Sequence, residues 1–390
     1  MLWNKLRGRP TVQADRGAVA AGRDQTINAP LATSGSMAAG GQATIATSES
    51  GGTTIVVQSG GMVNLVSSVD GLPQAKDPLL RAAFEEGQRL QQEGYEAQSA
   101  HKHREAIDRF TRALELAEND SQRAALHVLR GNSCYSISQY DEAQTDYEKT
   151  LKLAERISPV QDAAEARAAA LSGLGLVCSE RGDLEKAEEH HKQALDIHRK
   201  IGDRQSEAAT LDNLGTVYGR RGALDQAEEC FKQALAIDKE IGSSLGEATV
   251  LGNLGIVYRR RGEMQKAEKH HKKALKIARE IGNRLGEANH LGNLGIVYGQ
   301  RNGPGDLDKA EKHFKQALEI AGKIGYRLGE AADLANLGNV YRQRGDLSKA
   351  REYLQQAQTI YQKIGARGEG PDIVRRWLAE LERGQQERGE

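Results

Sequence analysis

One phrase recurs along this chain at a fixed interval. The string "NLGTVYGRRG" begins at Asn213, "NLGIVYRRRG" at Asn253 and "NLGIVYGQRN" at Asn293, forty residues apart. A repeat of 20 to 50 residues predicts an array of one helical or strand unit, because each unit can bury its apolar face only against its neighbours. The repeat therefore determines the expected architecture of the whole 390-residue chain more strongly than its length does.

The repeats align on their small residues. A glycine follows a leucine in five copies, and two alanines follow it. They stand twelve and nineteen positions later in four copies, and three positions further on in the copy of Gly295, where "NGPG" lengthens the turn: Gly175, Gly215, Gly255, Gly295, Gly338; Ala187, Ala227, Ala267, Ala310, Ala350; Ala194, Ala234, Ala274, Ala317, Ala357. Looser copies carry Gly94 with Ala106 and Gly131 with Ala143, which makes seven repeats. Apolar residues recur at intervals of three and four, as amphipathic helices require. Small residues let two helices approach closely, so we expect an all-α array of helix pairs.

This pattern resembles the tetratricopeptide repeat (TPR). The resemblance rests on the glycine of the first helix, an aromatic residue three positions later, and "KAExxxxxAL", as at Lys266 to Leu275. The literal "LGNLG" at Leu251 and Leu291 is similar to the forty-residue repeats of Leu-Gly-Asn proteins and kinesin light chains. The match covers about residues 80–368. It implies a right-handed α-solenoid of about seven TPR helix pairs.

The chain divides into three expected parts: a segment of low charge (1–75), the TPR array (76–368), and a capping helix with a polar tail (369–390). Residues 1–75 contain nine charged side chains and many Gly, Ser and Thr. Four β-prone pieces, "QTINAP", "QATIAT", "TTIVVQ" and "MVNLVSS", are separated by Gly or Ser pairs. The segment can be disordered, a small β-roll or an assembly motif.

Self-assembly is suggested by Thr53 to Ser68, which contains neither proline nor charge, as cross-β segments do. Its "VQSGGMVN" resembles the core of amyloid signalling motifs, and "RGAVAAGRDQTIN" resembles N-terminal segments of bacterial repeat and STAND proteins. A homo-oligomer formed through residues 53–68 is therefore one expectation, and a flexible linker is another.

At the other end, "PDIVRRWLAELER" places Ile373, Trp377, Leu378 and Leu381 on one helical stripe with charge opposite. A repeat array needs its last apolar face covered. We therefore expect a C-terminal capping helix, with a separate binding helix as the alternative.

Composition and missing motifs disfavour several functions. Lys plus Arg equals Asp plus Glu at 54 each, so no basic excess indicates nucleic acid. No apolar run has the length of a signal peptide or a membrane span, so we expect a cytoplasmic protein without membrane contact. The motifs GxxxxGK[ST], HExxH and GxSxG are absent, which predicts no enzyme and no cofactor.

Histidine pairs recur on the second helix. His190 with His191 and His270 with His271 hold equivalent places, and His313 recurs in a later repeat. Adjacent helical residues point about 100° apart, so such a pair cannot hold one metal as His at i and i+4 can. Phenylalanine occupies the position of His191 and His271 in two other repeats, which favours packing and predicts no metal site; ligation across repeats is the alternative.

The predicted peptide-binding residues come from the opening phrase: Asn213, Asn253, Asn293, Asn336, Arg220 and Arg260. In the Leu-Gly-Asn family the matching positions hold partner peptides on the concave side. Asparagine can pair with both groups of a peptide backbone, and arginine favours carboxylates. Gln300 and Gln343 replace the arginine in the last two repeats, and Gly173 replaces the asparagine in an earlier one. A second arginine column is expected to complement the negative end of the first helix: Arg221, Arg261, Arg301, Arg344.

Three functions are compatible with these features. The first is a non-catalytic protein-protein interaction scaffold that binds an extended, acidic peptide of a partner in the concave groove. The alternative is a bacterial signalling or defence component, in which the N-terminal segment drives homotypic assembly while the array senses or recruits. A metal-dependent activity at the histidine columns is a third possibility.

Overall fold

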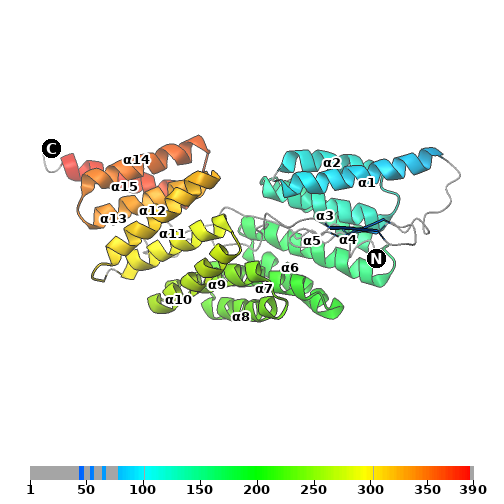
Figure 1. Cartoon of the computed structure of the whole chain (residues 1–390), viewed down its shortest axis with the longest axis horizontal. Coiled ribbons are helices and arrows are strands. Elements are labelled where there is room, and N and C mark those ends of the chain that lie inside the picture. The colour runs from blue at the N-terminus through cyan, green and yellow to red at the C-terminus, as the bar shows by residue number, and fades with distance from the viewer. Residues whose placement is uncertain are drawn as a thin grey trace. The chain divides into compact units, whose positions relative to one another are not determined.

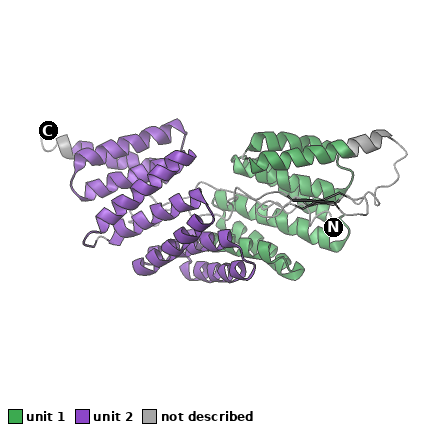
Figure 2. Ribbon diagram, in the orientation of Figure 1, with its two compact units in different colours: residues 1–14, 33–217 green, residues 15–32, 218–390 purple. Residues whose placement is uncertain are grey.

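The computed structural model describes residues 44–47, 53–56, 64–66, 78–100, 102–301 and 303–386, and within these ranges the side chains of residues 85–383. This part of the chain contains fifteen α-helices (Figure 1). They fall into two compact units, one ending at Val217 and the other beginning at Tyr218, within α7 (Figure 2).

The predicted helix pairs are confirmed. Seven pairs follow one another, and a last helix, α15 (Glu369–Gln386), completes the chain. The bounds of the pairs are α1 Pro78–Ser99 with α2 His103–Glu115, α3 Asp120–Ser136 with α4 Tyr140–Ala154, α5 Val160–Glu180 with α6 Leu184–Ile201, α7 Arg204–Arg221 with α8 Leu224–Glu240, α9 Ser244–Arg260 with α10 Met264–Glu280, α11 Arg284–Arg301 with α12 Asp306–Ile324, and α13 Arg327–Gln343 with α14 Leu347–Lys363.

Short turns separate the two helices of a pair. Between α9 and α10 the chain passes through Gly262, whose φ of 79° lies in the left-handed region that favours glycine. The Glu263 N–H donates to the carbonyl of Tyr258 at 2.9 Å, which caps the end of α9. The recurrent "RG" of the sequence is thus a helix stop, and the second helix can fold back at once.

Close packing within a pair explains the glycines that the repeat retains. A β-carbon built on Gly255 would lie 2.6 Å from the His271 ring, and one on Gly295 would lie 2.6 Å from the Phe314 ring. The same packing occurs in unit 1, where a β-carbon on Gly94 would lie 2.5 Å from the Phe110 ring. In these pairs the first helix therefore receives one large side chain of the second helix directly against its backbone.

Replacing Gly295 by alanine should destabilise unit 2 by about 1–3 kcal/mol, because the new methyl group would overlap the fully packed Phe314 ring. Gly322→Ala is the matched control: a β-carbon there would meet no atom within 4 Å, and alanine should stabilise the helix by up to about 1 kcal/mol. Urea titrations of both variants measure the difference. Equal effects would contradict the packing role of Gly295.

The capping helix is confirmed. Trp377 is 0% exposed, and Ile373, Leu378 and Leu381 are buried with it. They form one core cluster with residues of the last pair, among them Leu334 of α13 and Leu354 of α14. The apolar stripe of α15 therefore covers the last face of the array.

Three short strands form an antiparallel sheet in the N-terminal segment, in the order β1 (Thr44–Thr47), β2 (Thr53–Val56), β3 (Asn64–Val66). Ile45 pairs with Ile55, and Ile55 with Leu65. Three of the four predicted β-prone pieces thus contain a strand. The piece "QTINAP" and the rest of Thr53 to Ser68 lie outside the described residues.

Candidate functional site

The predicted asparagines lie inside the helix stack. In unit 2, Asn253, Asn293 and Asn336 stand once per first helix on α9, α11 and α13, and their exposed fractions are 0%, 4% and 3%. Asn213 belongs to unit 1 and is partly exposed. The recurring asparagines of unit 2 are therefore held between helices rather than displayed on an open surface.

Arginines share the face of these asparagines. Arg260 follows Asn253 by seven residues, close to two helical turns, so both project from one side of α9. We call the following side chains of unit 2 the inner row: Asn253, Arg259 and Arg260 on α9, Asn293 and Gln300 on α11, and Asn336 and Arg342 on α13. Arg220 lies at the end of α7 and is partly buried.

Each arginine of the inner row reaches toward a neighbouring first helix or α15. Arg260 donates to the carbonyl of Gly219 at the end of α7, and burial lowers the pKa of its guanidinium. Arg259, only 4% exposed, donates to the Gln300 side chain at 3.2 Å. Arg342 donates to the Glu380 carboxylate of α15 at 2.9 Å. The row therefore combines three buried asparagines and the buried Arg259 with the partly exposed Arg260, Gln300 and Arg342.

Sequence reasoning missed Arg259 and Arg342 as members of this row. Both precede the predicted arginine position by one residue. The signal that could have found them is their distance in sequence from a small residue: Arg259 follows Gly252 by seven residues, and Arg342 follows Ala335 by seven. Residues seven apart lie on the same face of a helix. The burial of Arg259 was not predictable from that interval, because it depends on how closely successive first helices pack.

The paired histidines pack as the phenylalanines do. His191 and His271 are 0% exposed, and their rings lie against Gly175 and Gly255. Burial lowers the pKa of His191 to about 3 and that of His271 well below its ordinary value, so both imidazoles are neutral near pH 7. Among residues 85–383 where side chains are described, no group of three or more His, Cys, Asp or Glu could hold a metal ion.

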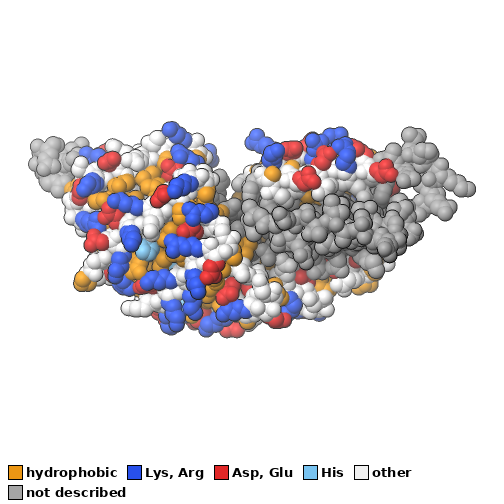
Figure 3. All heavy atoms as spheres, viewed as in Figure 1, with side chains coloured by type: hydrophobic (Ala, Val, Ile, Leu, Met, Phe, Trp, Pro, Cys, Tyr) orange, Lys and Arg blue, Asp and Glu red, His pale blue; other side chains and the backbone are white. Residues whose placement is uncertain are grey.

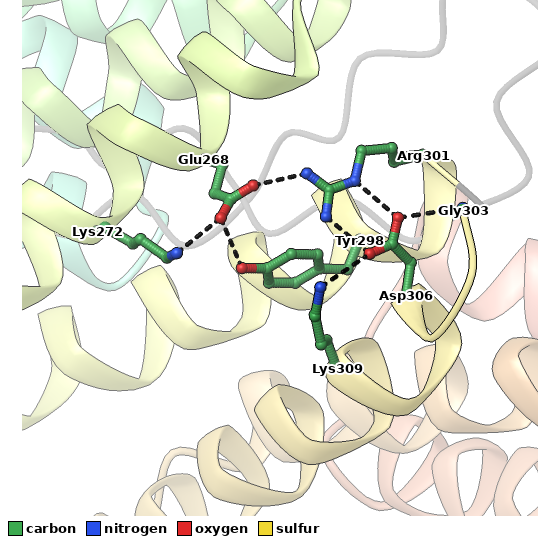
Figure 4. Close-up of polar contacts among 7 residues, drawn as sticks. All are labelled: Glu268, Lys272, Tyr298, Arg301, Gly303, Asp306 and Lys309. Atoms are coloured by element: carbon green, nitrogen blue, oxygen red, sulfur yellow. Dashed lines mark hydrogen bonds and ion pairs between the residues drawn. The ribbon is translucent and has the colours of Figure 1, made fainter.

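The second arginine column forms contacts between repeats that sequence reasoning did not predict. Arg301, at the end of α11, donates to Glu268 of α10 and to Asp306 of α12, each at 2.7 Å (Figure 4). The Tyr298 hydroxyl donates to the same Glu268 at 2.8 Å. We call this Arg-Glu-Tyr arrangement an inter-repeat clamp.

The clamp recurs in unit 2. Arg261 with Glu228 and Tyr258, and Arg344 with Glu311 and Tyr341, repeat the contacts. Burial acts to raise the pKa of Glu228, but hydrogen bonds from Lys232, Tyr258 and Arg261 outweigh it and lower the pKa to about 2. These arginines join successive repeats in addition to lying near the negative end of a helix.

Removing one clamp should loosen the junction of two repeats. Arg301→Met leaves Glu268 and the buried Asp306 without their guanidinium donor, and we expect a loss of about 2 kcal/mol in the free energy of unfolding. Lys312→Met, an exposed change on α12, is the control and should alter it by less than about 0.5 kcal/mol. Chemical denaturation tests both; a loss for Arg301→Met as small as the control's would contradict the clamp.

Comparison with known families decides the identity of the repeat. One tetratricopeptide repeat model matches residues 166–240, 246–304 and 305–363, and a second matches residues 129–200. The chain belongs to the tetratricopeptide repeat family. Among curated proteins, none matches this TPR chain in sequence.

Solved structures show the same fold at low identity. Aspartyl phosphate phosphatase F from Bacillus subtilis has a TM-score of 0.60 and 14% identity, covering 76% of this chain and 77% of its own. The Rap conjugation gene regulator of plasmid pLS20, in complex with the Phr* peptide, has a TM-score of 0.57 and 16% identity, covering 77% and 80%. BtubC from P. vanneervenii has a TM-score of 0.50 and 23% identity, covering 60% and 94%.

The TPR helices are amphipathic rather than uniformly apolar. In the described part of the chain, no helix combines the length and hydrophobicity needed to cross a bilayer. The helices of unit 2 carry many Lys and Arg side chains on the face shown in Figure 3. Five lysines of α10 are exposed: Lys266, Lys269, Lys272, Lys273 and Lys276.

Proposed function

We propose that the TPR array is a non-catalytic scaffold that binds an extended, acidic peptide of a partner protein along the inner row. The observation that carries this proposal is the recurrence of one asparagine per first helix, at Asn253, Asn293 and Asn336, beside arginines that are buried or partly buried. A line of amides one repeat apart suits a backbone that runs across several helices, because each amide offers one donor group and one acceptor.

The arginines of the row supply the preference for acidic side chains. Guanidinium groups bind carboxylates in paired hydrogen bonds, and such bonds are stronger where water is excluded. Arg259 is 4% exposed, and Arg260 is partly buried. Because the asparagines are buried as well, binding must separate successive first helices slightly, so we expect peptide binding and the opening of the row to be coupled. The peptide complex of the structurally similar Rap regulator supports this proposal by analogy.

The test is binding of fluorescent acidic nonapeptides to the full chain and to the double variant Asn253→Ala with Asn293→Ala. We expect the variant to bind at least tenfold more weakly, because the loss of two backbone contacts of about 1 kcal/mol each exceeds 1.4 kcal/mol. Measurements are made well below the melting temperature of both proteins. The control is Lys269→Gln with Lys273→Gln, on the outer helix α10. Unchanged binding in the asparagine variant would refute the inner-row assignment.

A second function is favoured by the three-stranded sheet β1–β3. Its outer strands leave backbone donors and acceptors at two edges, where a strand of another copy can add. We propose on this basis that the N-terminal segment mediates homotypic assembly in a signalling or defence protein whose array senses or recruits. Sedimentation velocity of the full chain and of a chain lacking residues 1–75 tests it. Assembly should disappear with the deletion, and equal monomeric behaviour would exclude it.

A further inference from the structure

The outer side of α10 carries lysines that the repeat pattern does not require. Three positions distinguish α10 from the second helices of neighbouring repeats: Lys269, Lys273 and Lys276, all exposed. The same positions of α6, α8, α12 and α14 hold five carboxylates, one lysine and six uncharged residues: Glu189, Gln193, Asp196; Glu229, Gln233, Ala236; Lys312, Gln316, Glu319; Glu352, Gln356, Thr359. The excess of positive charge is therefore particular to this repeat.

These three lysines take little part in holding the array together. Lys272, which recurs in other repeats, donates to Glu268 of a clamp at 2.6 Å. The side chains of Lys269 and Lys273, in contrast, have no ion pair or hydrogen bond among residues 85–383. Lys276 lies 3.7 Å from one carboxylate of its own helix, and both side chains are exposed. The charges of these lysines are therefore available to a partner outside the chain.

The lysines follow one side of the helix. Residues 269, 273 and 276 are four and three apart, and Lys266 precedes them on the same side, so we call these four side chains the lysine stripe. At 1.5 Å per residue the stripe covers about 15 Å of α10. Its charge acts on the neighbouring imidazole: burial lowers the pKa of His270, and Lys273 and Lys269 lower it further. The stripe is therefore a rigid line of cations that no carboxylate neutralises fully.

The exposed side chains of α10 indicate which partner fits. They are Gln265, the five lysines, Arg279 and Glu280, and none is apolar or aromatic. Such a surface lacks the anchors of a protein interface and the stacking groups that hold single-stranded bases. A flat lipid surface would also meet carboxylates at matching positions of the adjacent second helices, Glu229 of α8 and Glu319 of α12. A line of cations one helix wide matches the line of phosphates along one strand of a duplex.

We propose that the lysine stripe binds the phosphodiester backbone of a nucleic-acid duplex without reading its sequence. A lysine ammonium is a compact charge with three donors, which suits phosphate oxygens. The equal numbers of basic and acidic residues in the whole chain predict no such partner, but that balance conceals α10, which has six Lys or Arg against two Glu. Because the stripe lies on a second helix and the inner row on first helices, this inference does not depend on peptide binding.

Binding of the full chain to a labelled DNA duplex of about 20 base pairs, followed by fluorescence anisotropy, tests the stripe. Contacts with four phosphates should make the affinity fall about a hundredfold between 50 and 200 mM salt. The triple variant Lys269→Gln, Lys273→Gln, Lys276→Gln should bind at least tenfold more weakly at 50 mM salt, and its affinity should fall only about threefold over the same range, since one contact remains. The control removes three exposed lysines of α6: Lys186→Gln, Lys192→Gln, Lys200→Gln.

The control triple variant should bind the duplex within about twofold of the wild type, and this difference between the two variants would support the stripe. Equal weakening in both would show that the net charge alone attracts the duplex, and the proposal would be wrong. It would also be wrong if the wild type does not bind the duplex at 50 mM salt. Vesicles containing phosphatidylserine are measured in parallel. If the α10 variant loses the vesicles but keeps the duplex, a lipid surface is the partner and the proposal is overturned.

Discussion

Replacing Trp377 by alanine should lower the stability of unit 2 by about 3–5 kcal/mol, the range for removing a large buried aromatic side chain. Trp377 is 0% exposed and lies in the core cluster formed by α13, α14 and α15. The loss of stability should extend beyond the cavity that the missing indole leaves, because α15 covers the last face of a repeat array. The stability of each repeat depends on contacts with its neighbours. We therefore expect the final helix pair, α13 and α14, to unfold at a lower urea concentration than the other helix pairs of unit 2.

Urea unfolding followed by circular dichroism measures this effect, and hydrogen exchange locates it. The control is Arg376→Ala on the exposed side of α15, which should change the free energy of unfolding by less than about 0.5 kcal/mol. A loss below 1 kcal/mol in Trp377→Ala would show that α15 is not a structural cap. Exchange that rises uniformly in all repeats would contradict the local character of the effect.

The buried histidines should make the array acid-sensitive. The pKa of His191 is lowered to about 3 in the folded chain, against about 6.5 when unfolded, so the unfolded state binds the extra proton first. The contribution of neutral His191 to the free energy of unfolding is fully present above pH 6.5 and is lost progressively as the pH falls toward 3. At pH 5 the loss amounts to about 2 kcal/mol. His271 should act in the same direction, since burial above all, and then the nearby His290, Arg259 and His270, disfavour its protonation.

Phenylalanine is the matched substitution, because Phe231 and Phe314 occupy the same position in other repeats and are buried to the same extent. His191→Phe with His271→Phe should therefore raise the midpoint of urea unfolding at pH 5 far more than at pH 8. The reverse change, Phe314→His, should add to the acid sensitivity of unit 2. Equal stability gains at both pH values would contradict this explanation.

The helix pairs were predictable because their signal is local and repeated. Gly255 and Ala267 mark the close approach of two helices in each repeat, and Trp377 with its apolar neighbours marks a one-sided last helix. The clamps were predictable in principle as well. Arg261, Arg301 and Arg344 each follow their glutamate by 33 residues, an interval that recurs along the array.

The geometry of the inner row could not be predicted in the same way. Asn253 and Arg259 are buried because successive first helices pack closely, and this depends on the rotation between repeats rather than on any short sequence pattern. Gly299 looks in the sequence like another packing glycine. Only the structure shows that nothing fills the space beside it.

A crystal structure of the full chain with a bound acidic nonapeptide is the most direct test of the central claim. The account predicts an extended peptide along the inner row, with its backbone paired to Asn253, Asn293 and Asn336 and one of its carboxylates at Arg259. A peptide seated instead on the outer lysines of α10, with the asparagines still buried between helices, would contradict it.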